Sequence, residues 1–353
     1  MNVTPLFSVV INTYNYAHYL RECIDSALNQ TWPNVEVVVV DDGSTDNTRE
    51  VVLSYGDRLN AIFQANGGQG SAVNAGFAAC RGEWVIFLDA DDKLHPDTVE
   101  VVMEAARVAT SNVQYYLKVI DDASVDTGIR LPTRPMHEGD LRKVVALFRY
   151  YNSPPSSGNA YSRVFLQQVL PMPPEKWRIS ADAYLILAAP FYGFIDCVKR
   201  PLASYRRHGG GASDGGTRDL AGLRKFVHKE LTKEIKRELY VRTVINSHRY
   251  LLQMRTYMSP TYCKYLLMDC ELNREKFTIN ERIEILSQVF ICAARWPNYE
   301  FTHRVMFIIW CLTAMLLPLN WLTKFAARTM LPHWRSKGRL NRVWQQPMQQ
   351  PTD

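Results

Sequence analysis

The sequence predicts an α/β fold, a doubly wound and mostly parallel sheet followed by a mainly helical carboxyl-terminal region. Three observations lead to this prediction. Apolar strand-like runs and helical patterns alternate four times in about the first 110 residues, as they do in doubly wound sheets. The runs are nearly continuous, which is typical of parallel strands buried on both faces. Residues 218–300 instead carry apolar stripes at helical spacing and few glycines.

The four predicted strands cover residues 7–11, 35–40, 59–63 and 84–88. Two helices are expected over 17–29 and 49–53. A third is expected to follow the glycine-rich turn at 66–71 and to end at residue 79, and a fourth to start at Pro96. In the second half, residues 113–120 predict a strand and residues 140–150 a helix. We expect an amino-terminal domain over 1–217, with halves at about 1–110 and 111–217, and a second domain over 218–353.

The fourth strand stops at three carboxylates, Asp89, Asp91 and Asp92. Ligands of open α/β sheets bind outside the carboxyl ends of the strands, so these side chains lie where a ligand is expected. Three like charges raise one another's pKa unless a cation lies among them. Mg²⁺ and Mn²⁺ prefer carboxylates together with substrate phosphates. The alternative is a solvated loop in which the aspartates serve a turn and a helix start.

Two further segments have both a functional and a structural interpretation. The glycine-rich turn at 66–71 fits neither GxGxxG nor the P-loop pattern, but it could cradle a phosphate at a helix start. Its glycines would otherwise only supply turn conformations. Asp182 begins a helical pattern, where a carboxylate also answers the helix dipole. The loop at 152–159 is rich in turn formers and is a candidate substrate loop.

Six motifs occur together in the order and spacing of a known family. They are Asn-Thr-Tyr-Asn at 12–15, Asp-Asp-Gly-Ser-Thr-Asp at 41–46, Gly-Gln-Gly-Ser-Ala-Val-Asn at 68–74, Gly-Glu-Trp at 82–84 leading to Asp-Ala-Asp-Asp at 89–92, Asp182, and Tyr-Arg-Arg-His at 205–208. Over residues 5–215 the sequence therefore resembles the family-2 glycosyltransferases of the GT-A fold. The resemblance implies an inverting enzyme that uses a nucleotide-diphospho-sugar.

The resemblance also assigns a donor site. Tyr14 and Asp42 would hold the base by stacking and hydrogen bonding, while Asp89 and Asp91 occupy the positions of the family's DXD motif. A Mn²⁺ or Mg²⁺ ion would be bound by Asp91, His208 and Asp89, with Asp92 as an alternative ligand. Arg206 and Arg207 would steady the diphosphate. The other residues expected to bind the nucleotide-sugar are Thr13, Asn15, Gly68, Gln69, Ser71, Asn74 and Ala90.

Asp182 falls where the family places its general base. An acidic residue commonly precedes that base, and the sequence departs from this pattern with Ala181. The chemistry needs a carboxylate to take the proton of the attacking hydroxyl and a cation to neutralise the leaving diphosphate. We therefore expect a metal-dependent transfer of sugar, from a UDP-sugar by preference, to a hydroxyl of a glycan or lipid-linked acceptor in surface polysaccharide synthesis.

Two other functions are compatible with parts of the pattern. A sugar-nucleotide nucleotidyltransferase shares the α/β fold and an acidic metal site, but it would normally carry a basic, glycine-rich signature near the amino terminus. A nucleotide- or glycan-binding module without activity is the second. The presence of Asp42, Asp89, Asp91, Asp182 and His208 argues against the module. We expect no nucleic-acid partner.

The carboxyl-terminal third carries most of the positive charge. The formal net charge is +6, with −5 over residues 1–219 and +11 over residues 220–353. Residues 305–322 contain no charge and include Pro318, which leaves three readings: a helix buried against the catalytic domain, a helix lying in a bilayer surface, or a membrane span. Basic and aromatic residues over 303–344 favour the bilayer surface.

Other features concern the cell compartment. Seven scattered cysteines without CxxC spacing indicate reduced thiols, and the amino terminus lacks the pattern of a signal peptide. We therefore expect a cytoplasmic protein, peripheral on the cytoplasmic face of the inner or plasma membrane. Residues 345–353 are predicted to form a disordered tail.

Overall fold

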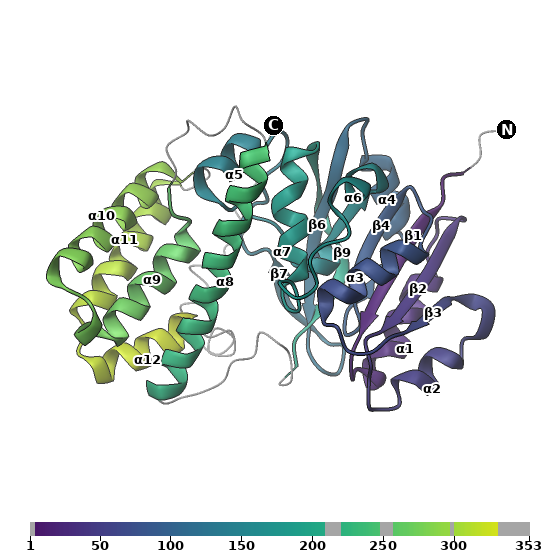
Figure 1. The fold of residues 1–353 in the computed structure, drawn as a ribbon, viewed down its shortest axis with the longest axis horizontal. Helices are drawn as coiled ribbons and strands as arrows, with labels where there is room; N and C mark the ends of the chain where they lie inside the picture. Colours follow the sequence, from purple (N-terminus) through teal and green to yellow (C-terminus); the bar gives the residue numbers. More distant parts are fainter. Residues whose placement is uncertain (1–3, 209–219, 248–256, 297–299, 331–353) are drawn as a thin grey trace. The chain divides into compact units, whose positions relative to one another are not determined.

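The chain divides into two compact units. A computed structural model of the protein describes residues 4–208, 220–247, 257–296 and 300–330 (Figure 1). The sheet unit consists of residues 1–142 and 151–207, and the helical unit consists of residues 143–150 and 208–353. The predicted domain boundary at residue 217 and the predicted tail at 345–353 lie outside the described residues.

Four parallel strands form the first half of the sheet, as predicted. They are β1 (Phe7–Thr13), β2 (Val35–Asp41), β3 (Asn60–Phe63) and β4 (Trp84–Asp89). Their order is β3-β2-β1-β4, which is that of a doubly wound sheet. All four strands therefore end at the same edge, where Asp41 and Asp89 are the last residues of β2 and β4.

Helices separate these strands along the chain. The helices up to residue 188 are α1 (Ala17–Leu28), α2 (Thr48–Leu53), α3 (Gln69–Ala79), α4 (Thr98–Ala105), α5 (Arg142–Phe148), α6 (Arg163–Val169) and α7 (Ala181–Ala188). The predicted helices of the first half are confirmed, except that α4 begins two residues after Pro96. α5 is shorter than the predicted helix over 140–150, and all of it except Arg142 belongs to the helical unit.

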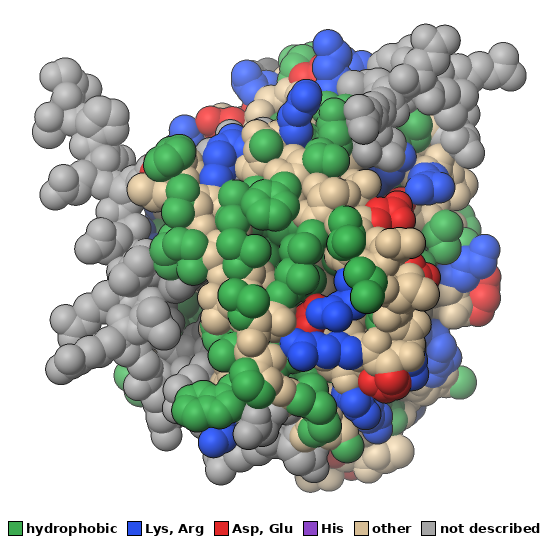
Figure 2. Space-filling view, turned by 90° about the vertical axis from the view of Figure 1, so that its left-hand side faces the viewer, with side chains coloured by type: hydrophobic (Ala, Val, Ile, Leu, Met, Phe, Trp, Pro, Cys, Tyr) green, Lys and Arg blue, Asp and Glu red, His purple; other side chains and the backbone are tan. Residues whose placement is uncertain are grey.

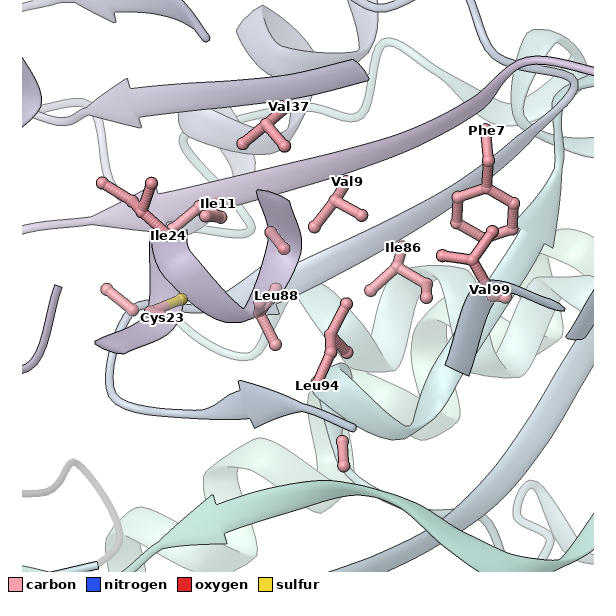
Figure 3. Close-up of a cluster of buried hydrophobic side chains, with 14 of the residues drawn as sticks. Phe7, Val9, Ile11, Cys23, Ile24, Val37, Ile86, Leu88, Leu94 and Val99 are labelled. Atoms are coloured by element: carbon pink, nitrogen blue, oxygen red, sulfur yellow. The ribbon is translucent and has the colours of Figure 1, made fainter. Parts of the chain in front are cut away.

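The central strands are buried because helices cover both faces of the sheet. Ile24 of α1 belongs to the same buried cluster as Val9, Ile86 and Leu88 (Figure 3). α3 covers the opposite face, where Gly76 lies so close to Val10 that a Cβ would be 2.3 Å from its Cγ1. Because side chains of a strand alternate between faces, this arrangement explains the unbroken apolar runs.

The second half of the sheet is mixed rather than parallel. Its strands are β5 (Lys93–Leu94), β6 (Thr110–Ile120), β7 (Asp126–Leu131), β8 (Asn159–Ser162) and β9 (Phe194–Arg206). Within the described residues the nine strands follow the order β3-β2-β1-β4-β8-β6-β9-β5, with β7 beside β6. β8 is antiparallel to both β4 and β6, whereas β9 is parallel to β6.

Only part of this half was predicted, for reasons that lie in the residues. The strand over 113–120 is confirmed as part of β6. β5 has two residues and β8 has four, too few to show an apolar pattern. β9 contains Lys199, Arg200 and Pro201, which interrupt its apolar residues, so the sequence indicates only its end.

The helical unit has a core of its own. Its helices are α8 (Leu220–Ser247), α9 (Pro260–Leu272), α10 (Ile279–Arg295), α11 (Phe301–Leu316) and α12 (Leu319–Met330). α9 begins at Ser259, whose hydroxyl accepts from the amide of Tyr262. α10 begins with a capping box between Thr278 and Glu281. Leu267, Val289 and Phe307 are among the buried residues that join these helices.

The predicted apolar segment at 305–322 is divided between two helices. α11 ends at Leu316, and α12 starts after Pro318, which cannot continue the first helix. Phe307, Trp310, Cys311 and Ala314 of α11 are buried. Across the part of the chain that the structure describes, no helix combines the length and apolar composition needed to cross a bilayer.

We predict that Leu88→Ala destabilises the sheet unit by about 2–5 kcal/mol, because it removes a fully buried side chain from the cluster of Figure 3. Leu53→Ala, at an exposed position of α2, serves as the control and should change stability by no more than about 0.5 kcal/mol. Urea unfolding, followed by hydrogen–deuterium exchange in peptides covering β1 and β4, measures both. If the two variants unfolded at the same urea concentration, Leu88 of β4 would not be a main contributor to the core of the sheet unit.

Candidate active site

A turn after β4 presents three carboxylates at the edge of the sheet. Asp89 lies opposite Asn12 of β1 in the parallel register. The amide of Asp92 donates to the carbonyl of Asp89 at 3.0 Å, and Ala90 is buried inside the turn. The apolar run of β4 ends at Asp89, so the chain leaves the sheet where its side chains become charged. Asp89, Asp91 and Asp92 therefore lie at the predicted strand end.

The charges of this turn act on one another. Burial raises the pKa of Asp89 well above its usual range, and the charges of Asp91 and Asp182 raise it further. Burial, followed by the charges of Asp91 and Asp89, likewise raises the pKa of Asp92. Asp182 lies in the first turn of α7, more than ninety residues along the chain. The charge of Asp182 is thus one of the causes of the raised pKa of Asp89, and its role as a base stays a prediction.

Arg206 binds this turn through hydrogen bonds from the interior of the protein. The side chain is buried, with its guanidinium donating to the carbonyls of Asp91, Asp121 and Asp122, the hydroxyl of Ser124 and the carboxylate of Glu22. Its backbone amide donates to Asp92 Oδ1 at 2.9 Å. The prediction of a diphosphate contact for Arg206 is corrected accordingly: the guanidinium points into the protein, where a positive charge is needed beside the acidic turn.

The two residues after Arg206 fall on either side of the boundary between the two units. The amide of Arg207 donates to the carbonyl of Ile120 at 2.9 Å, which continues the pairing of β9 with β6, and its side chain is half-buried. His208 begins the second segment of the helical unit, residues 208–353. Its predicted contact with a metal ion in the sheet unit therefore stays a prediction.

Three polar atoms at this edge lack a partner. Asn12 Oδ1, Thr13 Oγ1 and Asp92 Oδ2 are buried without a hydrogen-bond partner among the described residues. Buried oxygens of this kind are costly unless a ligand or ion completes them. They lie at the ends of β1 and β4, where the sequence predicted a ligand.

The residues here fit a divalent cation that is shared with a ligand. No group of three or more His, Cys, Asp or Glu side chains in the described ranges is arranged to hold a metal ion by itself. Mg²⁺ bound to phosphates needs only one or two carboxylates from the protein. The raised pKa values of Asp89 and Asp92 and the unpartnered Asp92 Oδ2 favour such a cation, because it would offset the repulsion within the turn.

The turns after β1 and β2 are tied together. Asn15, in a left-handed conformation at φ 59°, accepts at Oδ1 from the amide of Thr45, and its own amide donates to Ser44 Oγ. The amide of Asp42 donates to the carbonyl of Thr13. Tyr14 is 46% exposed between these contacts. An exposed aromatic ring is therefore available for stacking, next to Asp42.

The glycine-rich turn is engaged within the protein. The amides of Gly67 and Gly68 donate to the two carboxylate oxygens of Asp42, while those of Gln69 and Gly70 donate to the carbonyls of Arg178 and Trp177. Gly68 has φ +84°, and a Cβ there would meet the backbone of Arg178 at 2.7 Å. The amides that a phosphate cradle would use are thus already paired, and the turn instead allows the close approach of residues 177–178.

Polar side chains of α3 fix the segment that leads to Asp182. Gln69 Oε1 accepts from the amide of Ser180 at 2.7 Å and from that of Ala181 at 3.4 Å, at the start of α7. Asn74 pairs through both amide atoms with the backbone of Met172. Ser71 Oγ accepts from the side chain of Gln64. These residues, predicted to bind the nucleotide-sugar, contact the protein itself.

Some residues of the site were missed as individual candidates. Asn12 was recognised only as part of a turn, although a polar side chain directly after the apolar residues of β1 is a usable signal. Ser157 Oγ accepts from the amide of Asp89 at 3.1 Å, so the loop at 152–159 lies against the end of β4. Burial and the charges of Asp91 and Asp89 raise the pKa of Tyr16 to about 12. The sequence does not mark Tyr16, because its burial and its closeness to these charges depend on how the chain packs at the start of α1.

The arrangement has two chemical capabilities. Carboxylates of the turn can share a divalent cation with an anionic ligand, and the cation would then stabilise negative charge on that ligand. Asp182, whose charge contributes to the raised pKa of Asp89, is a carboxylate that can accept a proton from a neighbouring hydroxyl. Both functions meet at the carboxyl ends of parallel strands, which is the usual ligand position in this class of fold.

Comparison with known proteins finds glycosyltransferases among the proteins that this chain resembles. Residues 8–151 match the model of the family described as glycosyl transferase family 2. An uncharacterized glycosyltransferase of Nostoc sp. is 43% identical over 210 residues, which cover 57% of this chain and 65% of that protein. The hyaluronan synthase of Pasteurella multocida is 45% identical over 107 residues, 30% of this chain and 11% of that protein. The chain thus spans less than two thirds of the length of these curated relatives.

A solved structure also aligns with most of the chain. Staphylococcus aureus TarS 1-349 in complex with UDP shares 17% identity, over 92% of this chain and 90% of that chain, with a TM-score of 0.47. At that TM-score the likeness carries no weight for function.

We predict that Asp92→Asn raises the unfolding temperature at pH 7 in EDTA by a few degrees. Because the folded-state pKa of Asp92 is raised, its contribution to stability is present at low pH and is lost as the pH rises towards that pKa. The amide removes this ionisation and still accepts from Arg206. The gap between variant and native protein should therefore widen from pH 5 to pH 7.

Asp126→Asn is the matched control for this measurement. Asp126 is exposed, and a hydrogen bond from the Gly128 amide lowers its pKa, so this variant should gain no stability. Differential scanning fluorimetry across the pH range measures all three proteins. A lower unfolding temperature for Asp92→Asn at pH 7 would show that its charge is compensated without a metal ion.

Proposed function

Because the chain belongs to glycosyltransferase family 2, we propose that it transfers a sugar from a nucleotide-diphospho-sugar to a hydroxyl group of a glycan or lipid-linked acceptor. One observation carries the proposal: Asp182 contributes to the raised pKa of Asp89 together with Asp91. In this proposal a base, Asp182, and a cation-binding turn act together at the strand ends. This is the minimum that sugar transfer with a diphosphate leaving group requires.

The donor is a UDP-sugar in this proposal. Tyr14 stacks on the base, and Asp42 accepts a hydrogen bond from it. The support is their proximity, since the Asp42 amide donates to the carbonyl of Thr13, and the exposure of the Tyr14 ring. Asp42 Oδ2 accepts only the Gly68 amide among the described contacts, and a carboxylate oxygen has room for a second donor. Thr13 Oγ1 is a further polar atom for the donor.

A divalent cation, Mn²⁺ or Mg²⁺, is the cofactor of this reaction. Asp91 and Asp89 would hold it together with the diphosphate, with Asp92 and His208 as further ligands. When bound, the cation neutralises the charge that grows on the leaving diphosphate. The support from the chain is the mutual repulsion of the three carboxylates of the turn and the buried oxygen of Asp92. Arg206 keeps the turn in place from within the protein.

The transfer is a single displacement with inversion. The acceptor oxygen forms a bond to the anomeric carbon while the bond from that carbon to the diphosphate oxygen breaks, and the nucleoside diphosphate leaves with the electron pair. Asp182 takes the proton of the acceptor hydroxyl. Gln69, which accepts from the amides at the start of α7, orients this base with respect to the acidic turn.

The product in this proposal is a glycan of the cell surface, made on the cytoplasmic face of the inner or plasma membrane. Two relatives support a polysaccharide product by name. They are the hyaluronan synthase and the chondroitin synthase of Pasteurella multocida, each matched over less than a third of this chain.

We predict that Asp182→Asn lowers kcat by about 10²–10⁴-fold, because it removes the proton acceptor and leaves the fold intact. Binding of UDP should be unchanged, since the amide keeps the shape of the side chain. Initial rates with UDP-sugars and isothermal titration with UDP measure the two effects. Unchanged turnover would refute the role of Asp182 and leave the family assignment intact.

We predict that one nucleoside diphosphate, UDP by preference, stabilises the protein in the presence of Mn²⁺ or Mg²⁺. A ligand that binds only the folded state adds about 2.7 kcal/mol at a hundred times its dissociation constant. The thermal-shift panel contains UDP, GDP, dTDP and CDP, each with metal ion or with EDTA. Stabilisation should disappear in EDTA and in Asp91→Ala, while the exposed control Asp57→Ala retains it. A panel without any shift would overturn the donor site.

A further inference from the structure

The helical unit exposes an apolar face that its own core does not explain. On α11 the exposed large apolar residues are Phe301, Val305, Ile309, Leu312 and Leu316. They are spaced by four, four, three and four residues, so they form one stripe along the helix. Phe301 is 78% exposed and Leu316 is 83% exposed. A side chain of this size is normally buried.

The opposite side of the same helix is the buried one. Phe307, Trp310, Cys311 and Ala314 belong to the core of the helical unit. α11 is therefore apolar on both sides, and only one of them is covered by the described residues. A helix that is hydrophobic all round belongs in an environment where both sides leave water.

Neighbouring helices extend this surface. α10 packs against α11 and exposes Ile279, Ile283 and Phe290, again at helical spacing. Leu319 and Trp321 of α12 are also exposed. Figure 2 shows apolar side chains gathered over this side of the molecule, with Lys and Arg side chains and some Asp and Glu side chains beside them. We call these ten residues of α10, α11 and α12 the apolar face. Contiguous apolar surface on this scale marks a site of interaction.

The positive charge of the sequence around the apolar face indicates what kind of partner binds there. Residues 301–352 contain seven Lys and Arg and no Asp or Glu. Lys324 is exposed, with its Nζ 5.6 Å from the ring centre of Trp321. The acids of α10, Glu281 and Glu284, lie in its first two turns. Trp and Lys side by side, next to an apolar stripe, are the composition of helices that lie in a bilayer interface.

We infer that the apolar face docks on the surface of an anionic lipid bilayer, with α11 lying in the plane of the interface. Its 16 residues extend about 24 Å, too short for the hydrocarbon core of about 30 Å. A second copy of the chain is the alternative occupant, which the test below distinguishes. The docking is independent of sugar transfer and is measured without it.

The test uses the full-length protein and co-sedimentation with vesicles. Ile309→Glu combined with Leu316→Glu places two charges in the middle and at the end of the stripe. We predict that this double variant binds vesicles of phosphatidylcholine with about one third phosphatidylglycerol at least tenfold more weakly than the native protein. Val164→Glu, at a 70% exposed position of α6 in the sheet unit, is the matched control and should bind like the native protein.

A second variant tests the electrostatic part. Lys324→Glu should reduce binding to the anionic vesicles about tenfold, with little effect on the weaker binding to pure phosphatidylcholine. High salt should weaken binding of the native protein in the same way. Equal binding of Lys324→Glu and the native protein to anionic vesicles would overturn the assignment to an anionic surface.

Other results would assign the face elsewhere. If the native protein bound neither kind of vesicle, the inference would be overturned. So would a lipid-free dimer in analytical ultracentrifugation that the double variant converts to monomer, because the face would then belong to a second copy. Circular dichroism melting checks that the variants fold, and Ile309→Gln with Leu316→Gln replaces the double variant if it does not. UDP thermal shifts of the same proteins keep this result separate from the fate of the donor site.

Discussion

Repulsion among the carboxylates of one turn, of which Asp92 is fully buried and Asp89 and Asp91 are half-buried, is the constraint around which the sheet unit is arranged. Asp89, Asp91 and Asp92 follow one another at the end of β4, and Asp182 adds a fourth charge from α7. Such a cluster is stable only if compensating groups surround it. Arg206 supplies the one fully buried guanidinium that the described contacts bring to this turn, and it meets the turn through a carbonyl and a backbone amide. Asp92 Oδ2, which is buried without a hydrogen-bond partner among the described residues, is left for a ligand.

Much of the polar machinery positions other groups instead of touching a ligand. Gln69 and Asn74 reach across to residues 172–181, and Asp42 receives the amides of the glycine turn. These contacts join α3 to the segment that carries Asp182, so the proton acceptor and the acidic turn are held by one network. A site of this kind needs such support, because a misplacement of about 1 Å can cost a hundredfold in rate.

The sequence was most informative where a single segment carries the signal. The four parallel strands and the placement of Asp89, Asp91 and Asp92 follow from apolar runs that end in carboxylates. The antiparallel strand β8 and the buried state of Arg206 could not be predicted in this way, because both depend on partners far along the chain. The acceptors of Arg206 at residues 121–124 lie more than eighty positions away. A charged residue beside a motif looks like a ligand contact until its acceptors are known.

The helical unit differs in the opposite way from Arg206, because several of its apolar side chains are exposed. Its sequence is more apolar than its described contacts require. If α11 served only the core of that unit, the stripe from Phe301 to Leu316 could be polar at no cost to packing, because the buried residues lie on the other side. Apolar side chains facing water gain nothing for the folded state and raise the risk of aggregation. Their presence, together with seven cations and no acid over residues 301–352, is explained when the second side of α11 also leaves water, at a surface that carries negative charge.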